Sequence, residues 1–200
     1  MKKSKNATFI QRLGAFAIDM IILALILSIF TVFTVDTDNY QKLSDELVEV
    51  EEQCLEGEIT PMVYLNKSMD INYDISRETA LTTIISIALS MIYFMVYQFK
   101  KNGQTIGKKI MKIRIVSNDE KDLTMNQFAV RSLIINCVLA DLLLLAIVLI
   151  GTKNIYMIGT FTIEIIQYVL LFVIAIMVLS REDKRGLHDV IANTKVIKEV

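Results

Sequence analysis

FIQRLGAFAIDMIILALILSIF, residues 9–30, is the stretch that decides the class of this chain. It is almost wholly apolar, yet it has an arginine near its start, Arg12, and a carboxylate further in, Asp19. About 20 apolar residues are needed to cross the hydrocarbon core of a bilayer. An ionised side chain at that depth is costly and is retained mainly for a partner or a task. The stretch therefore predicts a membrane-spanning helix whose Asp19 has a partner inside the protein.

Three further stretches of the 200-residue chain have similar length and composition. Together they predict four spanning helices, at residues 13–35, 80–99, 127–150 and 155–179. The first is too long for a signal-peptide core and is not followed by a small-residue cleavage pattern, so we interpret it as a retained anchor. The predicted fold is an all-α polytopic membrane protein, with one transmembrane domain over residues 1–200.

The basic residues indicate how this protein is oriented in the membrane. Sixteen of the 21 Lys and Arg lie in residues 1–12, 100–126 and 180–200. Loops rich in Lys and Arg stay in the cytoplasm, so we expect a multi-pass protein of the cell membrane with both termini and the 100–126 loop inside. We call residues 100–126 the basic loop. The acidic connection 36–79 then lies outside the cell, and we call it the outer loop.

The outer loop holds 12 acidic and three basic residues, but it also has an apolar period. Three- and four-residue steps, typical of one helix face, separate Tyr40, Leu43, Leu47, Val50 and Cys54. We expect an amphipathic helix. Two interpretations remain open, a helix lying on the membrane or the bundle, and an acidic face that binds a cation or a partner. The two cysteines lie at different depths, which argues against a disulfide.

The basic loop contains the sequence NGQTIGKK, with Gly103, Gln104, Thr105, Gly107 and Lys108. A phosphate-binding Walker motif needs four residues between its glycines and then Lys-Ser or Lys-Thr, so nucleotide binding is rejected. We expect Thr105 to cap a short basic helix that lies against anionic lipid headgroups.

Two short segments predict a small cytoplasmic cap. Residues 112–116 alternate apolar and basic side chains, and residues 194–198 are similarly rich in β-branched residues. Both patterns are typical of strands. We expect the two segments to pair as a two-stranded sheet, which would join the C-terminal segment to the basic loop.

The depth of the charged residues within the predicted spans suggests a partner for Asp19. Arg12 shares its helix face but is about 10 Å away along the axis, too far for a direct pair. Arg131 lies four residues inside the predicted third span, and Asp19 lies six inside the first. At about 1.5 Å per residue these depths agree within a turn, so we predict an Asp19–Arg131 ion pair. It is interpreted either as a structural lock or as an inner gate.

A second depth match lies nearer the middle of the membrane. Asp141 is nine residues before the end of the third span, and Glu164 is nine after the start of the fourth. Two carboxylates at one depth do not both stay charged cheaply, so one would bind a proton or the two would share a cation. Gln167 and Asn136 add polar atoms nearby. A proton or cation site and a protonated pair that joins the two helices are both open interpretations.

The sequence offers no candidate residues for catalysis, metal binding or cofactor binding. His188 is the one histidine and has no neighbours at metal-ligand spacing. The sequence contains no nucleophile elbow, zinc motif, glycine-rich cofactor loop or intramembrane protease signature. The chain is therefore not expected to be an enzyme, and no cofactor, metal or nucleic acid is predicted as its partner.

Several segments together resemble the RDD family of bacterial membrane proteins, named for one arginine and two aspartates. QRLGAFAIDMIIL contains Arg12 and Asp19, which resemble the first two signature residues, and NGQTIGKKIMKIRIV resembles the inner-loop motif. Arg131 resembles the basic residue after that loop. RGLHDVIANTKVI resembles the closing segment, which suggests Asp189 as the second aspartate.

This resemblance implies a transporter or transport-associated membrane protein. Some members are proposed to be cation/proton antiporters, and others occur in membrane complexes or toxin resistance. The alternative is a non-catalytic accessory subunit of a larger membrane complex, with a role in assembly, immunity or resistance. Four helices are few for enclosing a solute path, so a homo-oligomer or a complex is expected. Asp141 and Glu164 do not belong to the signature.

Overall fold

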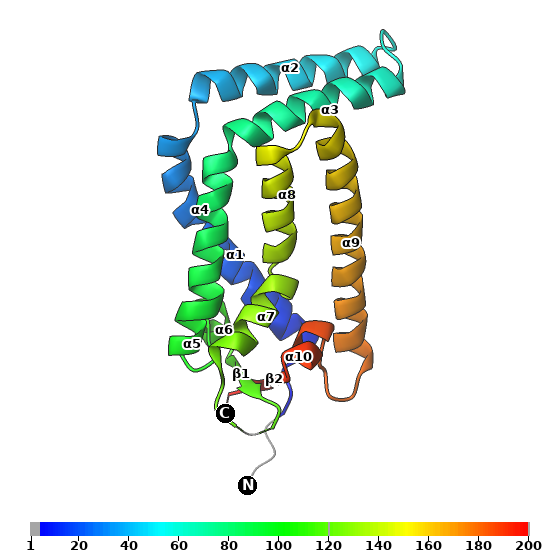
Figure 1. Cartoon of the computed structure of the whole chain (residues 1–200). Helices are drawn as coiled ribbons and strands as arrows, with labels where there is room; N and C mark the ends of the chain where they lie inside the picture. Colours follow the sequence, from blue (N-terminus) through cyan, green and yellow to red (C-terminus); the bar gives the residue numbers. More distant parts are fainter. Residues whose placement is uncertain (1–4, 120, 200) are drawn as a thin grey trace.

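The computed structural model describes residues 5–119 and 121–199, and these are helical apart from one small sheet. Figure 1 shows long helices running between a helical hairpin at one end, the hairpin end, and the sheet at the other, the sheet end. In chain order the elements are α1 (Phe9–Thr34), α2 (Thr37–Leu55), α3 (Pro61–Glu78), α4 (Ala80–Met91), the π-helix η1 (Ile92–Tyr97), α5 (Gln98–Lys100), α6 (Ile106–Ile110), β1 (Ile113–Ser117), α7 (Met125–Ile135), α8 (Val138–Ile150), α9 (Lys153–Ser180), α10 (Leu187–Ile191) and β2 (Thr194–Lys198).

The predicted all-α polytopic fold is confirmed. In the described part of the chain, α1, the continuous stretch Ala80–Lys100 and α9 are each long and apolar enough to cross a membrane. α7 and α8 pass the same test as a pair, so the chain has four candidate spans if this bent pair counts as one.

The third span differs from the prediction because it is not one helix. α7 and α8 meet at 63°. Cys137 between them has a φ of +58°, in the left-handed region, which no continuous right-handed helix contains. Asn136 ends α7, where its backbone N–H still bonds the Ser132 carbonyl and its amide donates to the Ser132 hydroxyl at 3.2 Å.

Threonines start four of the long helices. Thr8 and Thr124 each form a capping box with a glutamine three residues later, at the starts of α1 and α7. Thr60 and Thr152 cap α3 and α9. Each hydroxyl accepts a bond from a backbone N–H of the first turn, a group that the helix itself leaves without a partner.

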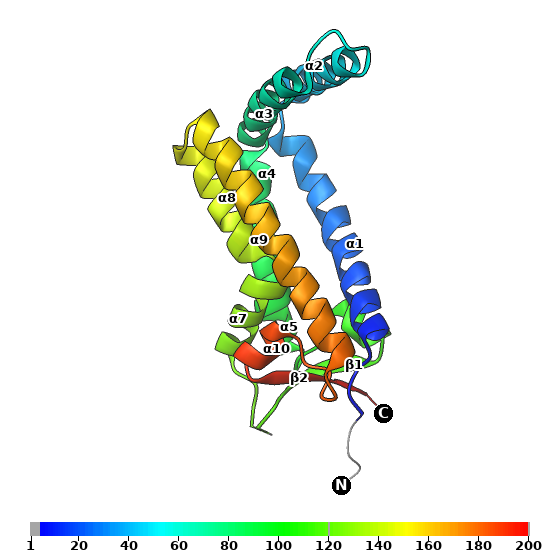
Figure 2. The same ribbon diagram turned by 90° about the vertical axis from the view of Figure 1, so that its right-hand side faces the viewer.

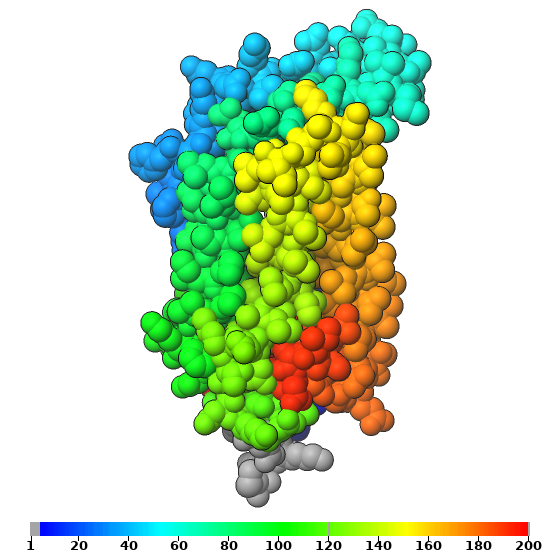
Figure 3. All heavy atoms as spheres, viewed as in Figure 1, coloured from blue at the N-terminus to red at the C-terminus, as the bar shows by residue number. Residues whose placement is uncertain are grey.

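The spans are arranged with α8 between α4 and α9, as the space-filling view in Figure 3 also shows. α1 packs on α4 and α6 and makes few contacts with α9, and the two helices diverge in Figure 2. Many large apolar side chains on α1 and α9 are exposed, for example Leu25 and Phe172. Such surface suits contact with lipid or with another helix.

The outer loop forms a helical hairpin, and the predicted amphipathic helix is confirmed as α2. α2 packs on α3, with Val50 buried. α3 in turn contacts the turn between α8 and α9, where the Tyr73 hydroxyl donates to the Gly151 carbonyl at 3.1 Å and the Tyr156 hydroxyl bonds Ser76 at 2.9 Å. The hairpin therefore rests on the bundle through α3.

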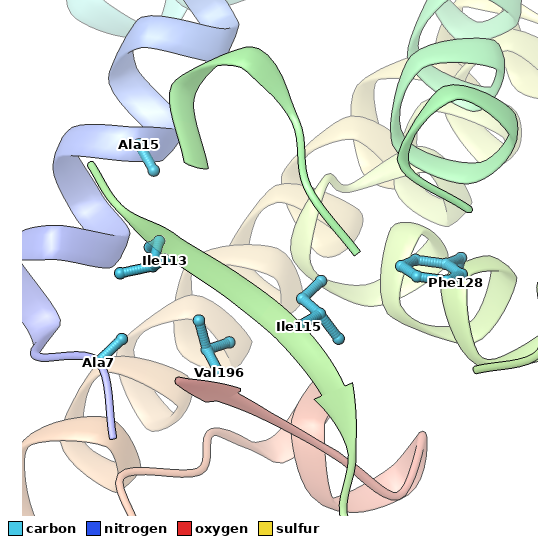
Figure 4. Close-up of a cluster of buried hydrophobic side chains, with 6 residues drawn as sticks. All are labelled: Ala7, Ala15, Ile113, Ile115, Phe128 and Val196. Carbon is cyan, nitrogen blue, oxygen red and sulfur yellow. The ribbon is translucent and has the colours of Figure 1, made fainter. Parts of the chain in front are cut away.

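The predicted sheet is also confirmed, shifted by one residue in its first strand. β1 and β2 pair antiparallel with Ile115 opposite Val196. Figure 4 shows the buried cluster around them, made of Ala7, Ala15, Ile113, Ile115, Phe128 and Val196. The Lys198 N–H bonds the Lys5 carbonyl, so both ends of the described chain meet at the sheet end. This core joins the N-terminal segment, the basic loop, α7 and the C-terminal strand.

Candidate functional site

Asp19 has no exposed surface and is held by neutral donors. Its Oδ1 accepts from the Tyr93 hydroxyl at 2.6 Å and from the Gly107 N–H at 2.7 Å. Its Oδ2 accepts from the Thr105 hydroxyl at 2.5 Å. Hydrogen bonds to a carboxylate are among the stronger ones, because the acceptor is charged. Asp19 therefore ties α1 to α4–η1 and to the start of α6.

The basic loop is shaped so that its backbone reaches Asp19. Thr105 caps α6, as predicted, by accepting from the Lys108 N–H at 3.2 Å. Gly107 lies so close to α1 that a Cβ there would stand 2.1 Å from the Ala15 carbonyl oxygen and 2.8 Å from Asp19 Oδ1. One side of α6 thus packs on α1, while Lys109 and Ile110 on its other side are exposed. Contact of that exposed side with lipid headgroups stays a prediction.

Of the remaining motif residues of the basic loop, Gly103 and Gln104 stabilise the turns before β1, and Lys108 of α6 packs on an aromatic ring. Gly103 has a φ of +86°, and a Cβ there would stand 2.2 Å from the Ile115 carbonyl oxygen, so only glycine fits. Gln104 donates to the Ile113 carbonyl and to Glu199. Lys108 lies over the Phe94 ring. Burial lowers the pKa of Lys108 to about 8, and the charge of Asp19 opposes that shift.

Asp189, which resembles the second signature aspartate, is also fully buried and pairs with two arginines, Arg12 and Arg131. Arg12 of α1 donates to its Oδ2 at 2.5 Å, and Arg131 of α7 pairs with its Oδ1. The Gly186 N–H adds a third bond at 3.1 Å. Arg131 also donates to the Thr194 hydroxyl at 2.6 Å. Asp189 therefore ties α1, α7 and β2 to α10.

These contacts correct the predicted Asp19–Arg131 ion pair. Asp19 is bound by Tyr93, Thr105 and Gly107, and Arg131 is bound by Asp189. The prediction took the third span as one straight helix and measured depth along it. Because α7 is bent away from α8, depth along a straight axis does not locate Arg131.

The arginine cluster sets the protonation of its neighbours. Burial by itself would raise the pKa of Asp189, but Arg131 and Arg12 outweigh it and hold that pKa well below its usual range. Burial, reinforced by the charge of Arg131, lowers the pKa of His188 to about 3. His188 is therefore neutral near pH 7. Its Nε2 lies 3.5 Å from Asp189, and within the described residues its buried Nδ1 has no hydrogen-bond partner.

A third polar group lies at the break in the third span. Asp141 stands in the first turn of α8 and is partly buried. The Gln167 amide of α9 lies near the Cys137 side chain at the break. Asn136 is bound to Ser132 of its own helix. The break therefore gathers a carboxylate, a thiol and two amides.

The structure does not bring Glu164 to this group. Within residues 5–119 and 121–199, no hydrogen bond or ion pair joins Glu164 to Asp141, and Glu164 is exposed on α9. On a helix it is turned about 60° from Gln167, at about 100° per residue. Depth alone did not reveal this direction, so the shared Asp141–Glu164 site is not formed within one chain.

Sequence reasoning did not assign Tyr93 and Thr194 to the two aspartates. Tyr93 belongs to a run of hydroxyl side chains at helical steps in the second span, with Thr83, Ser86, Ser90 and Tyr97, and that run was the available signal. Thr194 gave no such signal, since it begins a short strand between Asn193 and Lys195 and belongs to no run of hydroxyl side chains. Among the described residues, no group of three or more His, Cys, Asp or Glu side chains is placed to hold a metal ion.

Comparison with known protein families gives one match. The model of the RDD family matches residues 6–193, which is nearly the whole chain. No curated protein and no solved structure matches the chain.

Proposed function

Because the chain belongs to the RDD family and has the apolar helices of a membrane protein, we propose that it serves in transport across the membrane, exchanging a cation for a proton at Asp141. The observation that carries this proposal is the break in the third span, which leaves a carboxylate in the first turn of α8. Transporters commonly form their ion sites where a spanning helix is interrupted.

The physical reason lies in the two opposing influences on Asp141. The first backbone N–H groups of a helix lack partners within it and favour a negative charge nearby. A low-dielectric surrounding disfavours the same charge. A carboxylate under both influences exchanges its proton for a cation at a small cost in free energy. Gln167 and Asn136 supply amide oxygens, which are ligands suited to hard cations.

The sheet end supplies the other half of the proposal. It carries the basic loop and both ends of the described chain, so we assign it to the cytoplasm. Asp19 and Asp189 close this end by holding α6 and α10 against α1. Under this proposal they act as an inner gate, and a path from Asp141 to the cytoplasm opens when α6 leaves α1.

Proteoliposomes that contain a pH-sensitive dye test the exchange. Adding Na⁺ or K⁺ outside should drive protons across the membrane, and Asp141→Asn should abolish that flux. Asp45→Asn, which makes the same change on exposed α2, should leave it intact. Absence of flux from the unaltered protein with any monovalent cation would overturn the proposal, as would full flux in Asp141→Asn.

A second candidate function, an accessory subunit of a membrane complex, is favoured by the outer hairpin. Between α2, α3 and Lys153 lies an open groove of about 380 Å³ whose lining includes Glu46, Glu49, Asp70 and Asp74. An acidic surface held away from the bilayer suits a basic partner. Purification from native membranes in gentle detergents should then recover a stoichiometric partner. Replacing Glu46 and Glu49 with Gln should release it.

A further inference from the structure

Glu164 has no partner within the described chain, although it lies near the middle of a membrane-spanning helix. It is the eleventh residue after Lys153, at the start of α9, and is exposed. Its neighbours are large apolar side chains, with Phe161 45% and Ile165 61% exposed. A carboxyl group that faces lipid at this depth is costly even when protonated, because its polar atoms have no water to bond. Something other than lipid must cover this part of α9.

The face that carries Glu164 is distinct from the face that packs on α8. Gly159 lies against Ile147 of α8, and Gln167 lies near the Cys137 side chain. Glu164 is turned about 140° from Gly159 and about 60° from Gln167, so it borders the side of α9 where Phe161 and Tyr168 are exposed. We call Phe161, Glu164, Ile165, Tyr168 and Phe172 the α9 face. Since α1 makes few contacts with α9, the bundle itself leaves this face open.

The α9 face holds a donor that matches its own carboxyl. Tyr168 is 67% exposed and lies one turn after Glu164. Their Cα atoms are about 6 Å apart along the helix axis, and the longer tyrosine side chain, which leans toward the N-terminus, can span that distance. A buried tyrosine hydroxyl usually finds a hydrogen-bond partner. The face therefore contains a hydrogen-bond donor and an acceptor within one helical turn of each other.

We propose that a second copy of this chain covers the α9 face, with Tyr168 of each copy donating to Glu164 of the other. Two copies inserted the same way round are related by a two-fold axis along the membrane normal, which sets equal residues at equal depths. The second copy thus places its Tyr168 within one helical turn of Glu164 in depth.

A second copy fits this face better than a basic partner helix. Phe161, Ile165 and Phe172 provide apolar area on either side of the polar pair, and such area packs against its own copy without a further charge. The four spans of one chain also leave α1 and α9 apart, and a second copy completes the bundle beside them. The proposal concerns assembly and does not depend on the exchange at Asp141.

Disulfide trapping tests this interface in the full-length protein. Cys54 and Cys137 are first replaced by serine, and single cysteines are introduced by Phe161→Cys or Ile166→Cys. These positions stand about 140° apart around α9. Ile166 is 61% exposed against 45% for Phe161, so random collisions favour the control. In proteoliposomes at high lipid content, oxidation should cross-link Phe161→Cys into dimers and leave Ile166→Cys monomeric.

The polar pair is tested in the Phe161→Cys background. Tyr168→Phe and Glu164→Leu should each reduce the cross-linked fraction severalfold, while Glu164→Gln, which keeps an acceptor, should retain it. Thermal unfolding of each variant shows whether the monomer stays folded. Equal cross-linking at positions 161 and 166 would overturn the proposal, and so would none at either. In native membranes, a cross-link from position 161 to a different protein would also overturn it. A dimer without proton flux would refute only the exchange function.

Discussion

Arg131 of α7 is paired with Asp189 of α10, 58 residues further along the chain, and Asp189 accepts Arg12 of α1 as well. One carboxylate therefore compensates two guanidinium groups, the buried one of Arg131 and the partly buried one of Arg12. The other signature aspartate, Asp19, has no arginine and is held by two hydroxyl groups and one backbone N–H. The two aspartates close the same end of the molecule by different chemistry, and this difference determines how each responds to substitution.

Asp189→Asn should destabilise the protein strongly. It keeps the shape of the side chain but leaves Arg12 and Arg131 buried without a countercharge, which costs about 3–5 kcal/mol. Thermal unfolding in detergent measures the loss. Asp183→Asn is the matched control, because its pair with Arg181 is exposed to solvent and contributes little to stability. Equal melting temperatures for the two variants would show that the Asp189 cluster is not needed for the fold.

Thr105→Val should cost more than an ordinary cap. It removes the α6 cap, worth about 1 kcal/mol, and also leaves Asp19 Oδ2 without its 2.5 Å donor, worth about 1–3 kcal/mol. Thr124→Val removes the cap of α7 alone. The difference in unfolding free energy between the variants measures the bond to Asp19. No difference would mean that Thr105 acts only as a cap.

Gly107→Ala should separate α6 from α1. The added Cβ would stand 2.1 Å from the Ala15 carbonyl oxygen, which belongs to rigid backbone, and overpacking of this kind costs about 1–3 kcal/mol or more. Gly14→Ala is the control, because the nearest atom to its Cβ is the flexible end of Met111, at 3.1 Å. Limited trypsin digestion should cut the first variant faster at Lys108 and Lys109. Equal digestion of both would contradict the close packing.

His188 should make stability depend on pH. Its pKa falls from 6.5 to about 3 on folding, so between these values the unfolded chain binds the proton more tightly. Stability is therefore full above pH 6.5 and declines as the pH falls, by up to about 1.4 kcal/mol per unit. Melting temperatures from pH 7.5 to 5 measure this slope. His188→Gln should flatten it, and an unchanged slope in that variant would assign it to other groups.

The sequence by itself determined the local features, which depend only on the composition and pattern of one segment. The length and apolarity of the spans, the basic loop, the amphipathic α2, the Thr105 cap and the two β-branched strands are local properties, and the structure has them all. Arg12, Asp19 and Arg131 could also be singled out, because a charge in or beside an apolar helix is visible in the sequence, whereas Asp189 is suggested by the family resemblance alone.

Only the tertiary structure decided which partner each buried charged side chain has. Asp19 and Asp189 each accept hydrogen bonds from donors in several segments of the chain. The sequence of any one segment does not indicate which of those donors binds which carboxylate. Predicting Arg131 as the partner of Asp19 required a straight third span, and the left-handed Cys137 removes that condition. Likewise, depth placed Glu164 level with Asp141, but the rotation of α9 turned it outward. Period and composition report distance along a helix, whereas a hydrogen bond also requires direction, and packing sets that direction.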